Sequence, residues 1–226
     1  MNKKRDPVTA VDFQHERRRL PRRWPIATVS VLVVTAVLTV LQFPFPQVRL
    51  ALWRDPNALA AGQWWRLVTP LFVQNDAVWQ IVVVFAFIAG IGVLAERVFG
   101  PGRWLLLYLG CGVIGQAFGY LWAPPDAGAS VAGAGLLGAV CAWLLSPAGP
   151  RLARVSIWGV AWPLAGIVLT ALGDMHGPPL LVGFGLGALL LWRDRHRHRV
   201  VRRGRFQVAS SARALTNDRR RPGGAA

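Results

Sequence analysis

The sequence predicts an all-α integral membrane protein with six membrane-spanning helices. Of its 226 residues, 54% are hydrophobic and only 16% are charged, whereas soluble domains average about 25% charged residues. The charges are also unevenly placed, because most of the 26 lysines and arginines lie near the two ends of the chain. The stretches between them are apolar and approach the length of about 20 residues that a helix needs to cross the hydrocarbon core of a bilayer.

Six apolar segments are expected to be the spans. They cover residues 25–43, 78–95, 104–122, 130–146, 154–172 and 178–192. The fourth and sixth are short, so we expect them to require local thinning of the bilayer or burial by neighbouring helices. The first link, residues 44–77, is long and rich in tryptophan, which favours a structure at the membrane interface on the outer face.

The distribution of positive charge predicts the orientation of the spans. The second and fourth links carry arginines, and the third and fifth links carry none. Links that are rich in lysine and arginine stay in the cytoplasm. We therefore expect a multi-pass protein of the cell membrane with both termini in the cytoplasm.

Three regions follow one another along the chain. Residues 1–24 are expected to form a basic cytoplasmic tail, residues 25–192 the membrane domain, and residues 193–226 a second basic cytoplasmic tail that is disordered. Basic tails next to a membrane are attracted to anionic lipid headgroups by about 1 kcal/mol per residue near the surface. Although the net charge is +16, we therefore expect lipid headgroups and no nucleic acid as partners of the tails.

The membrane domain is expected to hold neither a metal nor a cofactor. No carboxylate lies in the middle of a span, and the two cysteines, Cys111 and Cys141, lie in apolar segments without a ligand spacing. Transporters that couple ions usually carry ionisable groups inside their spans. A transporter or channel is therefore a remote alternative.

Small residues at four-residue spacing indicate where helices approach closely. GxxxG pairs occur at Gly115 and Gly119 and at Gly183 and Gly187, and Gly135 belongs to a similar run in the fourth span. Backbones come close together where such residues line a helix contact. We expect Gly135, Gly183 and Gly187 to lie at contacts of this kind.

One serine and one histidine are candidates for nucleophilic catalysis. Ser130 begins the fourth span and is the only serine on the expected outer side, and His176 precedes the sixth span. Both spans run inward, so the two side chains are expected at a similar depth. A histidine beside a serine is the minimal unit that activates a hydroxyl nucleophile. Alternatively, Ser130 only caps its helix and His176 is an ordinary loop residue beside Asp174.

Three groups of residues together look like the motifs of a known family. They are Trp65-Arg66 with Thr69-Pro70 and Phe72, then Gly128-Ala129-Ser130 with Gly135-Leu136-Leu137-Gly138-Ala139, and finally His176 with Gly183 and Gly187. They resemble the WR…TPLF, GASG…GLLGA and last-span patterns of the rhomboid family of intramembrane serine proteases. The resemblance extends from about Gly62 to Trp192.

The resemblance implies a rhomboid-like bundle of six transmembrane helices with a catalytic dyad. Ser130 would be the nucleophile and His176 the base, and no third residue is required. The substrates would be transmembrane-helix proteins that are cut near the outer face. Trp65 and Arg66 would be structural residues of the outer loop.

The sequence departs from the family pattern around the nucleophile. Val131 stands where the family has a glycine. The family also places a histidine and an asparagine in the second span to bind the oxyanion. Counted back from Glu96, these positions hold Gln80 and Val84. Counted forward from Arg66, they hold Trp79 and Val83. Gln80 is thus the candidate oxyanion donor, and the loss of one such donor typically lowers kcat about 10²–10³-fold.

Two functions stay open on the sequence. The prediction is an intramembrane serine protease with a Ser130–His176 dyad. The alternative is a catalytically impaired pseudoprotease of the same fold, which binds membrane helices as clients without cutting them. The dyad supports the first function, whereas Val131 and the missing asparagine support the second.

Overall fold

The computed structural model describes residues 24–75, 77–122, 125–150 and 153–196, and all regular elements in these ranges are helices. The longer ones are α1 (Ile26–Leu41), α4 (Val78–Phe99), α5 (Pro101–Trp122), α6 (Ser130–Leu144) and α7 (Ala153–Ala171). A last helix begins at residue 177 and continues to residue 196, where the described part ends. The predicted all-α character is confirmed for this part of the chain.

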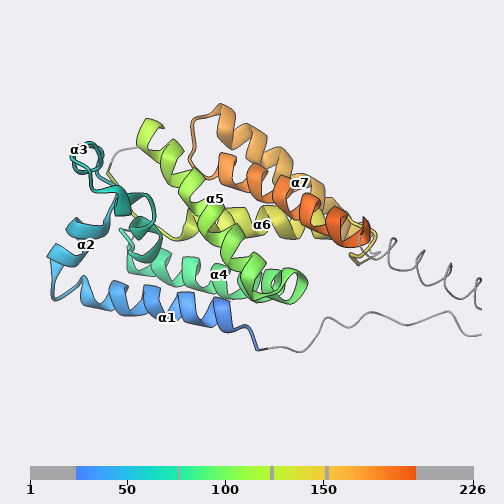
Figure 1. The fold of residues 1–226 in the computed structure, drawn as a ribbon, viewed down its shortest axis with the longest axis horizontal. Helices are drawn as coiled ribbons and strands as arrows, with labels where there is room; N and C mark the ends of the chain where they lie inside the picture. The colour runs from blue at the N-terminus through green and yellow to red at the C-terminus, as the bar shows by residue number, and fades with distance from the viewer. Residues whose placement is uncertain (1–23, 76, 123–124, 151–152, 197–226) are drawn as a thin grey trace, which may run out of the picture.

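Helix α6 lies between α4 and α7 (Figure 1) and contacts α4, α5 and α7. Most of its residues are glycine, alanine or other small residues, and most are buried. Its contact with the last helix is backbone against backbone. A Cβ atom at Gly183 would overlap the carbonyl oxygen of Gly135, and one at Gly187 would lie 2.7 Å from Cα of Ala139. Gly135, Gly183 and Gly187 therefore lie at one close helix contact, as small residues permit.

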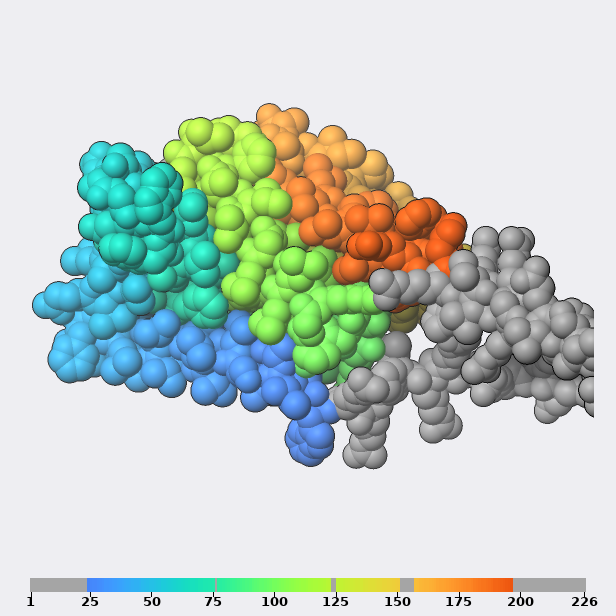
Figure 2. Space-filling view, viewed as in Figure 1, coloured from blue at the N-terminus to red at the C-terminus, as the bar shows by residue number. Residues whose placement is uncertain are grey.

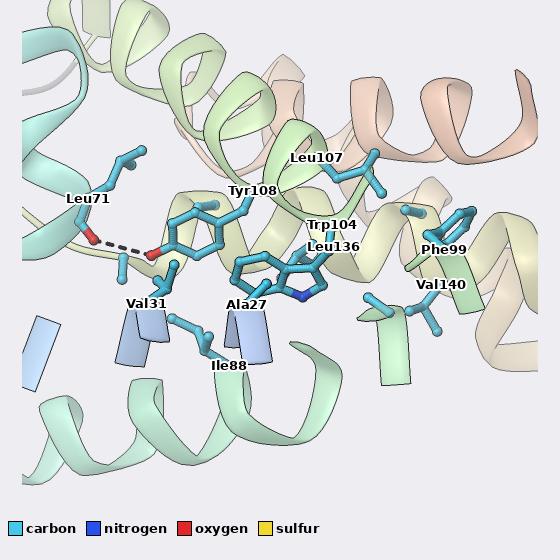
Figure 3. Close-up of a cluster of buried hydrophobic side chains, with 14 of the residues drawn as sticks. Ala27, Val31, Leu71, Ile88, Phe99, Trp104, Leu107, Tyr108, Leu136 and Val140 are labelled. Atoms are coloured by element: carbon cyan, nitrogen blue, oxygen red, sulfur yellow. Dashed lines mark hydrogen bonds between the residues drawn. The ribbon is translucent and has the colours of Figure 1, made fainter. Parts of the chain in front are cut away.

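A buried aromatic pair joins α5 to its neighbours. The rings of Trp104 and Tyr108 stack with centroids 5.0 Å apart, and both side chains are fully buried. The indole N–H of Trp104 donates to the carbonyl of Gly92 in α4 at 3.0 Å. The hydroxyl of Tyr108 donates to the carbonyl of Leu71 at 3.2 Å (Figure 3). Buried Tyr and Trp are stable where their polar atoms find such partners, so this pair ties α5 to α4 and to the first loop.

A carboxylate of α4 caps the start of α1. Helix α1 follows Pro25, and no side chain at that position caps it. Instead, Glu96 accepts hydrogen bonds from the backbone N–H groups of Ala27 and Thr28, at 3.0 and 2.8 Å, and from the Thr28 hydroxyl at 2.7 Å. The first N–H groups of a helix have no partner within the helix. Glu96 supplies that partner from a segment 68 residues further along the chain.

Two helices of the described part, α4 and α5, are long and apolar enough to cross a membrane by length and composition. Helices α1 and α6, and the segment Ile157–Ala171, are apolar but shorter. Large apolar side chains are exposed along α4, among them Trp79, Val82 and Val83. Exposed apolar surface on this scale is typical of a protein that contacts lipid or a partner.

The last helix is longer than the predicted sixth span. It was expected to end at residue 192 and to be followed by a tail, whereas residues 193–196 are helical. The guanidinium of Arg103 in α5 binds Asp194 through two hydrogen bonds, of 2.6 and 2.8 Å. This bidentate pair, a strong geometry, holds the polar end of the helix in place. The remainder of the two predicted basic tails, residues 1–23 and 197–226, lies outside the described residues.

The first loop is structured. It contains α2 (Pro46–Leu52), α3 (Pro56–Ala60) and the short 3-10 helices η1 (Trp64–Leu67) and η2 (Thr69–Phe72), and Figure 2 shows it gathered at one end of the molecule.

Arg66 lies at the centre of this loop. Its guanidinium donates to Gln63 Oε1 at 2.7 Å and to the backbone carbonyls of Leu50 and Trp53, at 3.0 and 2.8 Å. The side chain is almost fully buried, whereas the neighbouring Trp65 is about half exposed. Arg66 thereby connects η1 to α2, and Trp65 is available to an interface.

Candidate functional site

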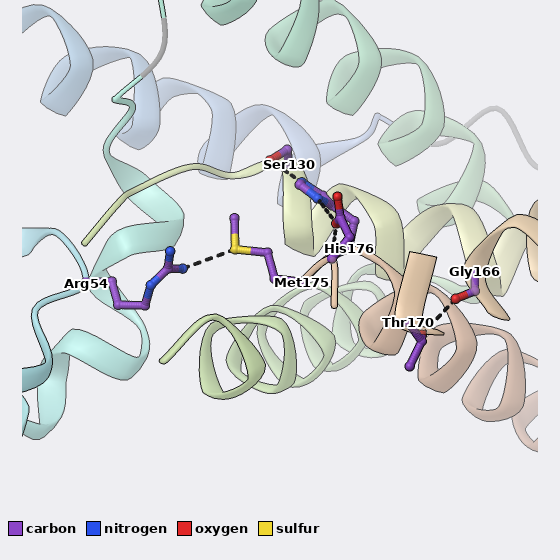
Figure 4. A network of polar contacts seen from close by, with 7 residues as sticks. Arg54, Ser130, Gly166, Thr170, Met175 and His176 are labelled. Atoms are coloured by element: carbon purple, nitrogen blue, oxygen red, sulfur yellow. Dashed lines mark hydrogen bonds and ion pairs between the residues drawn. The ribbon is translucent and has the colours of Figure 1, made fainter. Parts of the chain in front are cut away.

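Ser130 and His176 lie in hydrogen-bond contact. Ser130 is the first residue of α6, and His176 directly precedes the last helix. Oγ of Ser130 is 2.9 Å from Nε2 of His176 (Figure 4). This is the separation that an activated nucleophile and its base require.

The hydroxyl of Ser130 does not cap its helix. The N-cap position of α6 belongs to Ala129, and no side chain there makes a capping hydrogen bond. Because Ser130 occupies the first helical position, it lies at the positive end of the helix dipole, which favours developing negative charge. The hydroxyl is therefore engaged by His176.

Asp174 is the third member of this group. Its Oδ1 atom lies 2.8 Å from Nδ1 of His176 and accepts a hydrogen bond from the backbone N–H of His176, also at 2.8 Å. Since Nδ1 faces a carboxylate, it carries the ring proton, and Nε2 is left to accept the proton of Ser130. Asp174 was not among the predicted site residues, although its position two residues before the histidine is suited to such a local contact.

The carboxyl group of Asp174 stays ionised. Partial burial acts to raise its pKa, but the backbone hydrogen bond, the ring hydrogen bond and the electrostatic attraction of His176 together lower the pKa below its ordinary value. A carboxylate that accepts two hydrogen bonds favours its charged form. The base is thus oriented by a negative charge.

Neither Val131 nor the Pro178–Pro179 pair disturbs the contact between Ser130 and His176. Val131 is fully buried and faces α5, where a Cβ atom at Gly115 would lie 3.0 Å from the Cβ of Val131. Pro178 and Pro179 fall in the first turn of the last helix, a favourable position for proline. The carbonyl of His176 accepts the N–H of Leu180 at 3.3 Å. His176 is therefore held at the helix start.

Arg54 links the first loop to the segment that carries His176. It is fully buried, and its guanidinium donates to Gln116 Oε1 at 2.9 Å. It also donates to Sδ of Met175 at 3.2 Å (Figure 4). Burial lowers its pKa, while Asp126 and Tyr120 oppose this shift. A Cβ atom at Gly119 would overlap the guanidinium. Gly119, expected at a helix contact, instead makes room for Arg54.

The part of α4 that packs against the start of α6 is apolar. One turn after Ser130, a Cβ atom at Gly133 would lie 2.8 Å from Phe87 and 3.3 Å from Ile88. By helical register, Val84 is the residue of α4 level with Ser130. Within the described part of the chain, no hydrogen bond joins Gln80 to Ser130 or His176.

Known proteins are similar to this chain over the region that contains Ser130 and His176. The Rhomboid domain matches residues 61–196. The putative rhomboid protease YdcA of Bacillus subtilis (strain 168) is 35% identical over 128 residues, which are 52% of this chain and 61% of that protein. The rhomboid protease GluP of the same organism is 36% identical over 88 residues, which are 38% of this chain and 17% of that protein.

The chain therefore spans less than two thirds of the length of either relative. The domain match nevertheless includes Arg66, Ser130 and His176 and covers more than half of the chain. The chain belongs to the rhomboid family of membrane proteins.

Proposed function

We propose that this protein is an intramembrane serine protease that cuts transmembrane-helix proteins near the outer face of the membrane. The observation that carries the proposal is the 2.9 Å contact between Ser130 Oγ and His176 Nε2 at the start of a buried helix. Membership of a family whose relatives are named rhomboid proteases supports the same chemistry.

The reaction would follow the course of other serine hydrolases. Oγ of Ser130 attacks the carbonyl carbon of the scissile peptide bond, and its proton passes to Nε2 of His176. One electron pair of the C=O bond moves to the oxygen. When that pair returns, the C–N bond breaks, and His176 gives its proton to the leaving amine. Water then attacks the acyl group through the same proton transfers and restores Ser130.

The proposed orientation places this site on the outer side. In it, six helices cross the membrane, α1, α4, α5, α6, α7 and the last helix, and both termini are cytoplasmic. The first loop and the Ser130–His176 pair then share the outer end, and Arg103 with Asp194 lies at the cytoplasmic end. The basic tails would contact anionic lipid headgroups.

One observation favours a second candidate, a pseudoprotease that binds transmembrane helices without cutting them. The residue of α4 level with Ser130 is Val84, which has no hydrogen-bond donor. Loss of one oxyanion donor lowers kcat about 10²–10³-fold. A protein with this defect would retain helix recognition and lose most of its turnover.

Labelling with a fluorophosphonate distinguishes the two candidates. Purified protein in detergent should react at Ser130, and both Ser130→Ala and His176→Ala should abolish the label. Ser146→Ala is the matched control, because this serine lies beyond the far end of α6 and bonds the carbonyl of Trp143. If the wild-type protein stays unlabelled while it binds a transmembrane peptide, the pseudoprotease is the better assignment.

A further inference from the structure

We propose that the side-chain amide of Gln74 donates a hydrogen bond to the oxyanion that forms when Ser130 attacks its substrate. The inference rests on the proposed protease activity and names a donor that α4 does not provide. Gln74 lies in the segment between η2 and α4. Its role follows from how its backbone is held, from the state of its amide, and from the space it shares with Ser130.

The backbone around Gln74 is fixed on both sides. The side-chain amide of Gln42 donates to the carbonyl of Gln74 at 2.8 Å and accepts the N–H of Gln74 at 3.4 Å. The N–H of Asn75 donates to the carbonyl of Ala127 at 3.3 Å, and the N–H of Gly128 donates to the carbonyl of Pro70 at 2.9 Å. The end of the first loop therefore runs beside the segment that leads into Ser130.

The amide of Gln74 is buried and unpaired. The side chain is fully buried, and neither Nε2 nor Oε1 has a hydrogen-bond partner among the described residues. Buried side-chain amides nearly always have a partner, because burial without one is unfavourable. An amide in this state is ready to bind a group that arrives with the substrate.

The amide and the nucleophile border the same space. The position of a Cβ atom at Gly128 lies 3.5 Å from Oγ of Ser130 and 3.8 Å from Oε1 of Gln74. This space is open because residue 128 has no side chain. A carbonyl attacked by Ser130 brings its oxygen within a few ångströms of Oγ, and the inference places that oxygen on the side where Gln74 lies.

The amide can present its N–H end to this space. The two ends of a glutamine amide exchange by a half-turn, and here the turn breaks no hydrogen bond because both ends are unpaired. On attack, the C–O bond to Ser130 forms and one electron pair moves to the carbonyl oxygen. Gln74 then shares the new negative charge with the backbone N–H groups at the start of α6, as in other oxyanion sites.

The rate of labelling by a fluorophosphonate tests this role, because its phosphoryl oxygen occupies the oxyanion position. Gln74→Leu in the full-length protein should slow the covalent step about 10²–10³-fold and leave the concentration dependence unchanged. In Gln74→Glu only the protonated acid can donate, so the ratio of its rate to the wild-type rate should fall as the pH rises through the titration of the new carboxyl group.

Two further variants separate this role from a structural one. Gly128→Ala places a methyl group at ordinary contact distance from both side chains, so it should slow labelling without lowering the melting temperature. Thr39→Val is the control, since it also removes an unpaired buried polar group but lies in α1, and it should label at the wild-type rate.

Wild-type labelling rates in both Gln74→Leu and Gly128→Ala would overturn this inference and leave the protease proposal intact. A pH-independent ratio for Gln74→Glu would overturn it as well, and this measurement decides if Gln74→Leu does not fold. Absence of any label at Ser130 in the wild-type protein would overturn both proposals together.

Discussion

Asp174 gives His176 its orientation within the site. The carboxylate bonds both the ring and the backbone N–H of the same residue, so the imidazole is fixed in its rotamer and in its tautomer before a substrate arrives. A dyad that lacked this contact would have to fix the ring at the moment of reaction. The outcome is a three-residue arrangement where the family resemblance implied two.

We expect Asp174→Asn to slow labelling of Ser130 by roughly 10²-fold. The loss should be smaller than the ~10⁴-fold loss of turnover for a buried triad carboxylate, because the side chain of Asp174 is 43% exposed. Asp55→Asn is the matched control in the first loop, where Asn caps α3 about as well as Asp. Equal labelling rates for Asp174→Asn and the wild-type protein would show that the base needs no orienting charge.

The same carboxylate makes stability depend on pH. Since folding lowers the pKa of Asp174, its stabilising effect is present above the unfolded value of about 3.9 and is lost as the pH falls through the lower folded value. The wild-type protein should therefore melt at a higher temperature than Asp174→Asn above about pH 4. Thermal melts in detergent should converge as the pH falls further, and a constant difference would contradict this linkage.

Among the elements, the first loop depends on one buried charge. Arg66 donates to a side chain and to two carbonyls. Each hydrogen bond to a charged group contributes about 1.5–3 kcal/mol to the free energy of unfolding. Arg66→Ala should therefore lower the melting temperature in detergent by several degrees. Arg49→Ala is a suitable control, because Arg49 makes an exposed bond to Asn75. An unchanged melt would mean that Arg66 has no structural role here.

The sequence predicts some elements of the structure better than others. Apolar runs located the helices to within a few residues, because burial and membrane length leave few alternatives. The end of the last helix was missed because Asp194 has its partner, Arg103, 91 residues away. The contact of Ser130 with His176 was expected from the motifs. The places of Gln74 and Arg54 depend on how loops pack, which no local pattern encodes.

Across the whole molecule, polar groups gather at the two ends. The first loop, Ser130 and His176 lie at one end. Arg54 of the loop binds Met175 beside His176, and Gly128 beside Ser130 binds the carbonyl of Pro70 in the loop. The Arg103–Asp194 ion pair belongs to the other end of α5. Between them, the surface of α4 is largely apolar. This division fits a protein that crosses a bilayer.

Reporter fusions test the proposed orientation. Fusions after residues 24, 100, 150 and 200 should report the cytoplasm, and fusions after residues 60, 126 and 175 should report the outside, because arginines occur in the second and fourth links and not in the third and fifth. An outside signal after residue 200 would require an odd number of spans and would rule out the six-span arrangement.

The cap that Glu96 provides for α1 has a consequence for biosynthesis. The N–H groups of Ala27 and Thr28 emerge from the ribosome long before their acceptor, so α1 is made with its first turn incomplete and gains its cap only after α4 has been made. Chains truncated after residue 95 and released from the ribosome should exchange these two amide hydrogens faster than released chains truncated after residue 100. Helix α1 is thus synthesised first, but its cap forms only after α4 has been synthesised.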